Sequence, residues 1–316
     1  MKFNINKKAI IIFLAVFVAL VITATFTDLG VSKILVDLDD GKYYSDNLFG
    51  VIGEVFGSFP IYYMIGLAVI IFGFNGFAFD KKWNYACLIA GLAVGFVAMF
   101  IGADDCLKDF ADHSHKFEEW KSIYKILLAT GFALLFEVPT VLFIAKCSNE
   151  TKRKLMIFAS IILLMVIISQ IFIYILKPLA GRARYRAIHV LGDESMYDKW
   201  FVFHGTRLSD NSTLIALEAA KDAYRSFPSG HTASTAAVYA LVTLPLIFDK
   251  FDNKKWKIIL YTSTILLTGY VAVSRIVVGA HFFSDVLFGG TITFVSVFAG
   301  AFITKKIYDK IVSKKQ

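Results

Sequence analysis

The stretch RSFPSGHTASTAAVYALVTLPLIF, residues 225–248, joins a polar segment directly to an apolar one. Its apolar part, from Thr232 to the end, has the length of about 17 residues that a membrane-spanning helix needs. Its polar part holds Pro, Ser, Gly and His at 228–231, residue types that open helices and let a ligand approach closely. The stretch therefore predicts a membrane helix that begins at a polar site.

Similar apolar runs recur along the whole chain. The 316 residues are 57% hydrophobic and only 18% charged, far from the composition of soluble proteins. Runs of roughly 17 to 25 apolar residues predict about eight helices. We expect an all-α fold, a polytopic transmembrane helical bundle that forms one membrane domain over residues 1–316. The predicted helices are Ala9–Leu29, Ser58–Phe79, Tyr85–Ala103, Ile123–Ala145, Leu155–Leu176, Thr232–Phe248, Trp256–Val273 and Phe282–Ile303.

Short basic segments predict the orientation. Lys and Arg gather near the N-terminus, at 80–84, 146–154 and 249–257, and in the C-terminal tail. The segments between these are acidic, so the positive-inside rule places both termini in the cytoplasm. The net charge of +8 is explained by a lipid bilayer as partner, and nucleic acid is excluded. The first apolar run is longer than that of a signal peptide, which predicts an uncleaved anchor.

One long segment breaks this charge pattern. The loop 177–230 is expected on the outer face, yet it begins with KPLAGRARYR and ends with KDAYRSFPSG, and both segments are basic. Basic residues are disfavoured on that face, so they need another reason to be there. A bound anion is the reason that we expect. The Lys- and Ile-rich composition further indicates a bacterial plasma or inner membrane.

Three polar segments are predicted to meet at this outer face. The third of them, SRIVVGAHFFSD at 274–285, carries two residues of chemical interest, His281 and Asp285. If a helix begins near Ala280, both lie on one helix face, and the carboxylate can orient the imidazole and make it a nucleophile. His231, in the second segment, is then a candidate general acid. The first segment contributes Lys177, Arg182, Arg184 and Arg186.

The cations of these segments suit a phosphoryl group. Lys177, Arg184 and Arg275 are expected to hold phosphoryl oxygens, the arginines through their planar fork. Backbone N–H groups at Ser229 and Gly230 would face the same anion where a helix begins. Within the three segments Asp285 is the lone carboxylate, so we predict neither a metal ion nor another cofactor.

The same residues resemble a known family. KPLAGRAR at 177–184, PSGH at 228–231 and SRIVVGAHFFSD at 274–285 resemble the signatures KxxxxxxRP, PSGH and SRxxxxxHxxxD of the type 2 phosphatidic acid phosphatase (PAP2) superfamily. The second and third segments match in full. In the first, Arg184 stands at the expected distance from Lys177, although Tyr185 follows it where the family has Pro.

The resemblance implies a six-helix catalytic core and metal-independent hydrolysis of membrane lipid phosphates through a phosphohistidine. It implies His281 as nucleophile, Asp285 as the residue that orients it, and His231 as acid. The chain has about five predicted helices before the first motif, where the family usually has three, so we interpret residues 1–84 as additional helices and 85–316 as the core. The implied phosphate contacts are Lys177, Arg184, Ser229, Gly230 and Arg275, with Arg182 and Ser274 as weaker candidates.

Other interpretations stay open at this point. A lipid phosphotransferase on the same scaffold, or a non-catalytic transporter of an anion or lipid, would use a similar basic mouth. The substrate can be an isoprenoid diphosphate, phosphatidylglycerol phosphate, phosphatidate or a phosphorylated glycolipid, since each has a terminal phosphate on an apolar anchor. Asp109, with Asp112, His113 and His115, is expected in a solvated outer loop rather than in a metal site.

Overall fold

The structure, a computed structural model, describes residues 7–39, 41–76, 83–113 and 120–313. Within these ranges the protein is all-helical, and 8 segments are long and apolar enough to cross a membrane. The predicted fold class is therefore confirmed, and the chain is an integral, multi-pass membrane protein. Its α-helices are α1 (Lys7–Leu35), α2 (Leu48–Gly57), α3 (Phe59–Phe74), α4 (Asn84–His113), α6 (Ser122–Lys146), α7 (Asn149–Ala180), α8 (Tyr185–Leu191), α9 (Ser212–Ala216), α10 (Gly230–Thr235), α11 (Leu244–Ile247), α12 (Lys254–Val277) and α13 (Phe283–Ser313).

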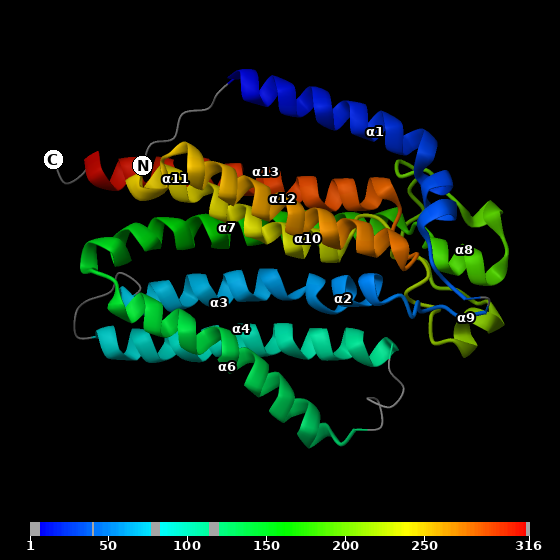
Figure 1. Ribbon diagram of the computed structural model, residues 1–316, viewed down its shortest axis with the longest axis horizontal. Coiled ribbons are helices and arrows are strands. Elements are labelled where there is room, and N and C mark those ends of the chain that lie inside the picture. The colour runs from blue at the N-terminus through cyan, green and yellow to red at the C-terminus, as the bar shows by residue number, and fades with distance from the viewer. Residues whose placement is uncertain (1–6, 40, 77–82, 114–119, 314–316) are drawn as a thin grey trace.

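The long helices lie side by side along one axis, and the short helices α8 and α9 gather at one end (Figure 1). In this bundle α3 packs against α4, α7 against α13, and α2 against α12. α1 runs along α13 toward the α8–α9 end, while α6 leans away from the other helices (Figure 1). α7 ends and α13 begins toward the α8–α9 end, so two of the polar segments are brought there.

α4 is longer than its apolar run predicts. It continues past Ala103 to His113, and Asp109 therefore lies on a helix rather than in the expected outer loop. The extension carries an ion pair between Lys108 and Asp104 at 2.6 Å, one turn apart. Pairs of this spacing support a helix after its apolar residues end. The side chains of Asp112 and His113, and residue His115, lie outside the described parts of the structure.

The helix expected to begin at Ser58 is preceded by another one, α2. The Asn47 side chain caps α2 by accepting a hydrogen bond of 3.0 Å from the backbone N–H of Gly50. α2 approaches α12 closely, since a Cβ placed on Gly53 would lie only 2.0 Å from the hydroxyl oxygen of Ser274. This contact brings Glu54, which interrupts the apolar pattern of α2, into the protein interior.

The helix predicted over Thr232–Phe248 is not one regular α-helix. It consists of α10, a 3-10 segment η4 (Ala236–Thr243) and α11. Pro245 has no N–H, so the carbonyl of Leu241 cannot receive the usual α-helical bond from it. That carbonyl accepts from the N–H of Leu244 instead, which tightens the helix by one residue.

A buried carboxylate helps to attach α1 to the bundle. Most of its apolar side chains are exposed, as expected for a surface that faces lipid. Three residues of the helix are fully buried, Ala24, Asp28 and Ser32, and Asp28 is the charged one. Its carboxylate accepts hydrogen bonds from Arg182 at 3.0 Å and from the N–H of Ser284 at 2.8 Å. The first helix, interpreted as an addition of unknown role, thus contacts a residue of the first motif and the start of α13.

We expect Asp28→Ala to lower the free energy of unfolding by about 3–5 kcal/mol, because it leaves a buried guanidinium with one carboxylate fewer. The matched control is Lys33→Ala on the same helix, which removes an exposed ion pair with Glu194 and should cost about 0–1 kcal/mol. Thermal unfolding of both variants in one detergent checks this. Equal losses for the two variants would show that Asp28 does not anchor α1.

Candidate active site

The three motif segments come together at one end of the bundle. The N–H of Ser229 donates to the carbonyl of Asp285 at 3.0 Å, which joins the second motif to the third. The N–H of Ser226 donates to the carbonyl of Arg182 at 3.1 Å, which joins the first motif to the segment before the second. Lys177, in the last turn of α7, lies beside Gly230, where a Cβ would be 3.4 Å from its Nζ.

His281 is held as a buried imidazole with a defined tautomer. Its Nδ1 lies 2.5 Å from the carbonyl oxygen of Ser226, and the residue is 1% exposed. A carbonyl oxygen only accepts, so Nδ1 carries the proton and Nε2 keeps its lone pair. Nε2 is buried and has no hydrogen-bond partner among the described residues. The geometry therefore presents Nε2 as a nucleophile.

The surroundings of His281 are cationic. Burial lowers the pKa of His281 well below its ordinary value. Asp285 opposes this change, while the positive charges of Arg184, Lys177 and Arg275 lower the pKa further. The imidazole is therefore neutral at physiological pH, and three predicted phosphate contacts are near enough to act on it electrostatically.

Asp285 does not orient His281 in the expected way. α13 begins at Phe283 rather than near Ala280, so His281 precedes the helix instead of sharing a face with the carboxylate. The distance from His281 Nδ1 to Asp285 Oδ2 is 3.9 Å, too long for a hydrogen bond. The expectation of a direct helical pair was therefore wrong, and the carbonyl of Ser226 takes the place of the carboxylate.

The carboxylate of Asp285 is connected to His281 through Ser226. It accepts hydrogen bonds from the Ser226 hydroxyl at 2.5 Å, from the N–H of Phe282 at 2.8 Å and from Arg182 at 2.6 Å. Ser226 thus connects the two, since its hydroxyl binds Asp285 and its carbonyl binds His281. Asp285 positions the imidazole indirectly, by holding the segment that contacts it.

The three arginines of the first motif have different surroundings. Arg182 is 1% exposed and makes four hydrogen bonds inside the protein, to Asp28, Asp285, the hydroxyl of Ser284 and the carbonyl of Asp198. Its place is therefore among the protein's own acceptors, and the weaker expectation of a phosphate contact finds no support here.

Arg184 and Arg186 share one carboxylate. Arg184 contacts Asp222 at 2.8 Å and donates at 3.2 Å to the carbonyl of Ala280, directly before His281. Arg186 also binds Asp222, and its guanidinium lies 4.5 Å from the ring centre of Tyr43. Burial would raise the pKa of Asp222, but the two arginines outweigh it and hold the pKa below its usual range. Of the three arginines, Arg184 bonds to the residue directly before His281, in agreement with the spacing argument.

The motif residues of α12 are also buried. Arg275 is 1% exposed and forms a two-pronged ion pair with Glu54, at 2.7 and 2.6 Å. Its Nε has no hydrogen-bond partner among the described residues. The hydroxyl of Ser274 donates to the carbonyl of Val271 at 2.7 Å, so its predicted phosphate contact has a competing use. The hydroxyl of Ser229 caps α10 by accepting from the N–H of Thr232 at 3.4 Å.

His231 stands on the first turn of α10 and has an acidic partner. Its Nε2 lies 3.0 Å from a carboxylate oxygen of Asp109, which belongs to α4. Asp28, Glu54 and Asp222 likewise each bind a cation of the first or third motif. The sequence shows these acids, but no spacing relates them to their partners.

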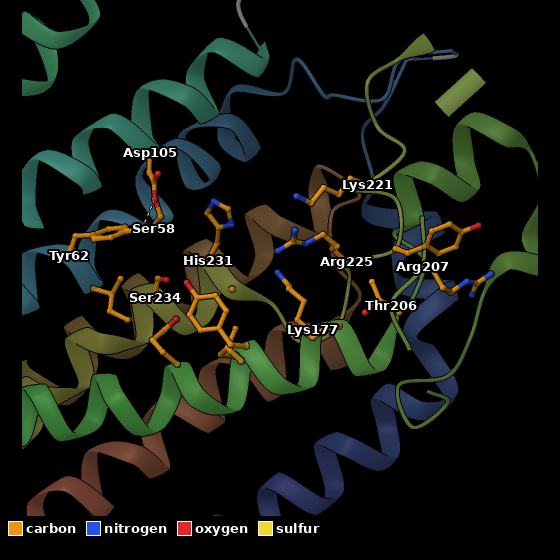
Figure 2. Close-up of a pocket in the computed structure, with 18 of the residues that line it drawn as sticks. Ser58, Tyr62, Asp105, Lys177, Thr206, Arg207, Lys221, Arg225, His231 and Ser234 are labelled. Atoms are coloured by element: carbon orange, nitrogen blue, oxygen red, sulfur yellow. Dashed lines mark hydrogen bonds between the residues drawn. The ribbon is translucent and has the colours of Figure 1, made fainter. Parts of the chain in front are cut away.

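A pocket of about 550 Å³ opens beside Lys177 and Gly230. Figure 2 shows Lys177, Arg225, Lys221 and His231 pointing toward one another in its polar part. The other part of the pocket is apolar and lies between α3 and α7. The aliphatic residues that line this part are Ile61, Ile65 and Ile173. One cavity thus combines a cationic end with an apolar end.

The neutral state of His281 predicts how stability depends on pH. The unfolded chain takes up a proton on this imidazole below about pH 6.5, and the folded protein resists it. The neutral imidazole therefore costs the folded protein no stability above about pH 6.5. Below that pH the free energy of unfolding decreases, and it continues to do so until the pH reaches the lower pKa of the folded state. We expect the unfolding temperature in detergent to fall more steeply between pH 7 and 5 for the wild type than for His281→Gln. Parallel curves would contradict this.

A family model matches the part of the chain that carries the three motifs. Residues 158–309, from within α7 to within α13, match the family model described as the PAP2 superfamily, and the match includes all three motif segments. No curated protein and no solved structure matches the chain. The resemblance carried by the motifs is confirmed. Residues 158–309 of the chain are thus similar to the PAP2 superfamily over the whole region that carries the motifs.

Proposed function

We propose that the protein is a metal-independent phosphatase for lipid phosphates or lipid diphosphates that works through a phosphohistidine. The observation that carries the proposal is the buried Nε2 of His281, which has no hydrogen-bond partner among the described residues and has cations around it. A neutral imidazole with a free lone pair is a nucleophile, and fixed cations stabilise charge on a phosphoryl group. Similarity to a phosphatase superfamily supports the same reaction class.

In the proposed first step, Nε2 of His281 forms a bond to phosphorus, and the bond between phosphorus and the leaving oxygen breaks. Lys177, Arg184 and Arg275 hold the phosphoryl oxygens during this transfer. The leaving oxygen keeps the electron pair of the broken bond and takes a proton from His231. The products of this step are a lipid alcohol or lipid phosphate and the phosphohistidine.

In the second step, water attacks the phosphohistidine. His231, now neutral, removes a proton from the water as the new oxygen–phosphorus bond forms. The nitrogen–phosphorus bond breaks, its electron pair returns to Nε2 of His281, and inorganic phosphate leaves. The carbonyl of Ser226 keeps the proton on Nδ1 throughout, so the same nitrogen is regenerated as nucleophile.

The pocket supports an amphiphilic substrate. Its cationic end adjoins Lys177 and Gly230, where the head group would enter, and its apolar end would hold the start of the lipid tail. Gly230 and the hydroxyl of Ser229 stay predicted phosphate contacts at the beginning of α10, whereas the backbone N–H of Ser229 is already used by the carbonyl of Asp285.

We further propose that the site opens at the outer membrane face and that both termini are cytoplasmic. α7 supports this orientation, because its first turns carry Lys152, Arg153 and Lys154 and its last turn carries Lys177. Its 32 residues span about 48 Å, more than the hydrocarbon core, so the two ends lie at opposite faces. The positive-inside rule then assigns the first turns to the cytoplasm, in a bacterial plasma or inner membrane.

His281→Ala is expected to abolish phosphate release, by at least about 10³-fold, because it removes the nucleophile. The measurement is phosphate release by the purified protein from phosphatidate, phosphatidylglycerol phosphate, an isoprenoid diphosphate and a phosphorylated glycolipid. Wild-type activity should persist in excess EDTA, because in the proposed reaction Lys and Arg neutralise the phosphoryl charge.

The same assay separates the alternatives. Full activity of folded His281→Ala on every active substrate would overturn the phosphohistidine mechanism. Transfer of the phosphoryl group to an added alcohol in place of water would indicate a phosphotransferase. Saturable binding of the lipids by the wild type without phosphate release would indicate a transporter.

Arg225→Ala is expected to raise KM by roughly 3- to 10-fold with a smaller change in kcat, because an exposed guanidinium at the pocket adds binding energy without touching the transferred group. Lys42→Ala, which removes an exposed cation paired with Asp39 and Asp46, is the matched control. A loss in kcat with unchanged KM would place Arg225 at the chemical step instead of at the entrance.

A further inference from the structure

A carboxylate outside residues 158–309, the region that matches the PAP2 superfamily, contacts His231, the candidate general acid. Asp109 belongs to α4, which ends before residue 158, where the family match begins. Its Oδ2 lies 3.0 Å from Nε2 of His231. Both side chains are partly exposed, at 22% and 23%, so the pair is accessible to solvent and ligands.

The imidazole of His231 is oriented from two sides. α2 approaches it so closely that a Cβ on Gly57 would lie 3.3 Å from both Cβ and Cδ2 of the histidine. Asp109 contacts the adjacent atom, Nε2. The opposite ring edge, formed by Nδ1 and Cε1, therefore points away from α2. Two helices that precede the family region therefore determine how this ring is turned.

The hydrogen bond also determines which nitrogen can exchange a proton with a substrate. An ionised carboxylate only accepts, so Nε2 of His231 carries a proton that it donates to Asp109. Nδ1 is then the nitrogen that gains and loses a proton during the reaction. A carboxylate in this place stabilises the imidazolium and keeps the ring in one tautomer, which is the role of the acid that orients a catalytic histidine.

The nearby carboxylates of α4 have other partners. Asp105, one turn before Asp109, accepts a hydrogen bond of 2.6 Å from the hydroxyl of Tyr62. Asp104 pairs with Lys108 at 2.6 Å. Among these three acids of the helix end, the contact with His231 is made by Asp109.

We propose that Asp109 is a positioning residue for His231 in phosphoryl transfer, an inference that rests on the proposed function. It holds Nε2–H so that Nδ1–H faces the leaving oxygen as the bond from phosphorus to that oxygen breaks. The oxygen keeps the electron pair and takes the proton from Nδ1. In the second step Nδ1 takes a proton from water, and the bond to Asp109 again holds the ring.

The test compares substrates that do and do not need a proton on the leaving group. We use kcat/KM, which reports the formation of the phosphoenzyme, for a short-chain alkyl phosphate and for p-nitrophenyl phosphate. Asp109→Asn should lower kcat/KM for the alkyl phosphate by about 10- to 100-fold, as loss of acid catalysis does. The loss for p-nitrophenyl phosphate should be several-fold smaller, since nitrophenolate leaves without protonation.

Three further variants make the test specific. Asp104→Asn, on the same helix but without contact to His231, should leave both values unchanged. Asp109→Glu should restore part of the alkyl phosphate activity, because it keeps a carboxylate within reach. In a double-mutant cycle, Asp109→Asn should cause no further loss in a His231→Ala background, because the partner through which it acts is gone.

The outcomes separate this inference from the proposed function. Equal losses of Asp109→Asn on both substrates, or an additive loss with His231→Ala, would overturn the positioning role while leaving the phosphatase in place. A wild-type protein that releases no phosphate from either ester or from the lipid panel would overturn the proposed function, and the positioning role with it. If the kcat/KM of Asp109→Asn for the alkyl phosphate equals that of Asp104→Asn, the inference is likewise contradicted.

Discussion

The buried guanidinium of Arg182 is the interaction on which the rest of the site depends. It binds Asp28 of α1 and Asp285 of α13, and all three side chains are almost completely buried. A buried charge without a partner costs several kcal/mol, so these elements cannot separate independently. Because Asp285 also binds the hydroxyl of Ser226, the same ion pairs hold the carbonyl that orients His281. His281 is thus positioned by a chain of contacts that begins at the membrane helix α1.

The site collects positive charge and balances it with acids from other parts of the chain. Glu54 of α2 pairs with Arg275, and Asp109 of α4 contacts His231. Each of these acids precedes the region that matches the PAP2 superfamily, as does Asp28. Cations in a low-dielectric interior repel one another strongly unless carboxylates lie between them. The N-terminal helices therefore contribute to the electrostatics of the motif residues, in addition to any role in the bilayer.

The environment of His281 favours a neutral imidazole. Removal from water disfavours the protonated imidazole, and the surrounding cations disfavour it further. The carbonyl of Ser226 adds direction, because it accepts from Nδ1 and leaves the lone pair on Nε2. A carboxylate at the same distance would instead favour the imidazolium. Asp285, at 3.9 Å from the ring, opposes this lowering of the pKa without cancelling it, and it still holds the segment that binds the ring.

The sequence determined the class of fold and the similarity of residues 158–309 to the PAP2 superfamily, because both depend on local patterns. Apolar runs indicate membrane helices wherever they stand, and the spacings around Lys177, His231 and His281 are readable within short segments. The tertiary structure alone decided which acids pair with them. Glu54 lies 221 residues from Arg275, and Asp109 lies 122 residues from His231. Nothing in the sequence indicates which cation a given carboxylate binds. The two charges are brought together by the packing of helices, which approach so closely at glycines that no side chain would fit there.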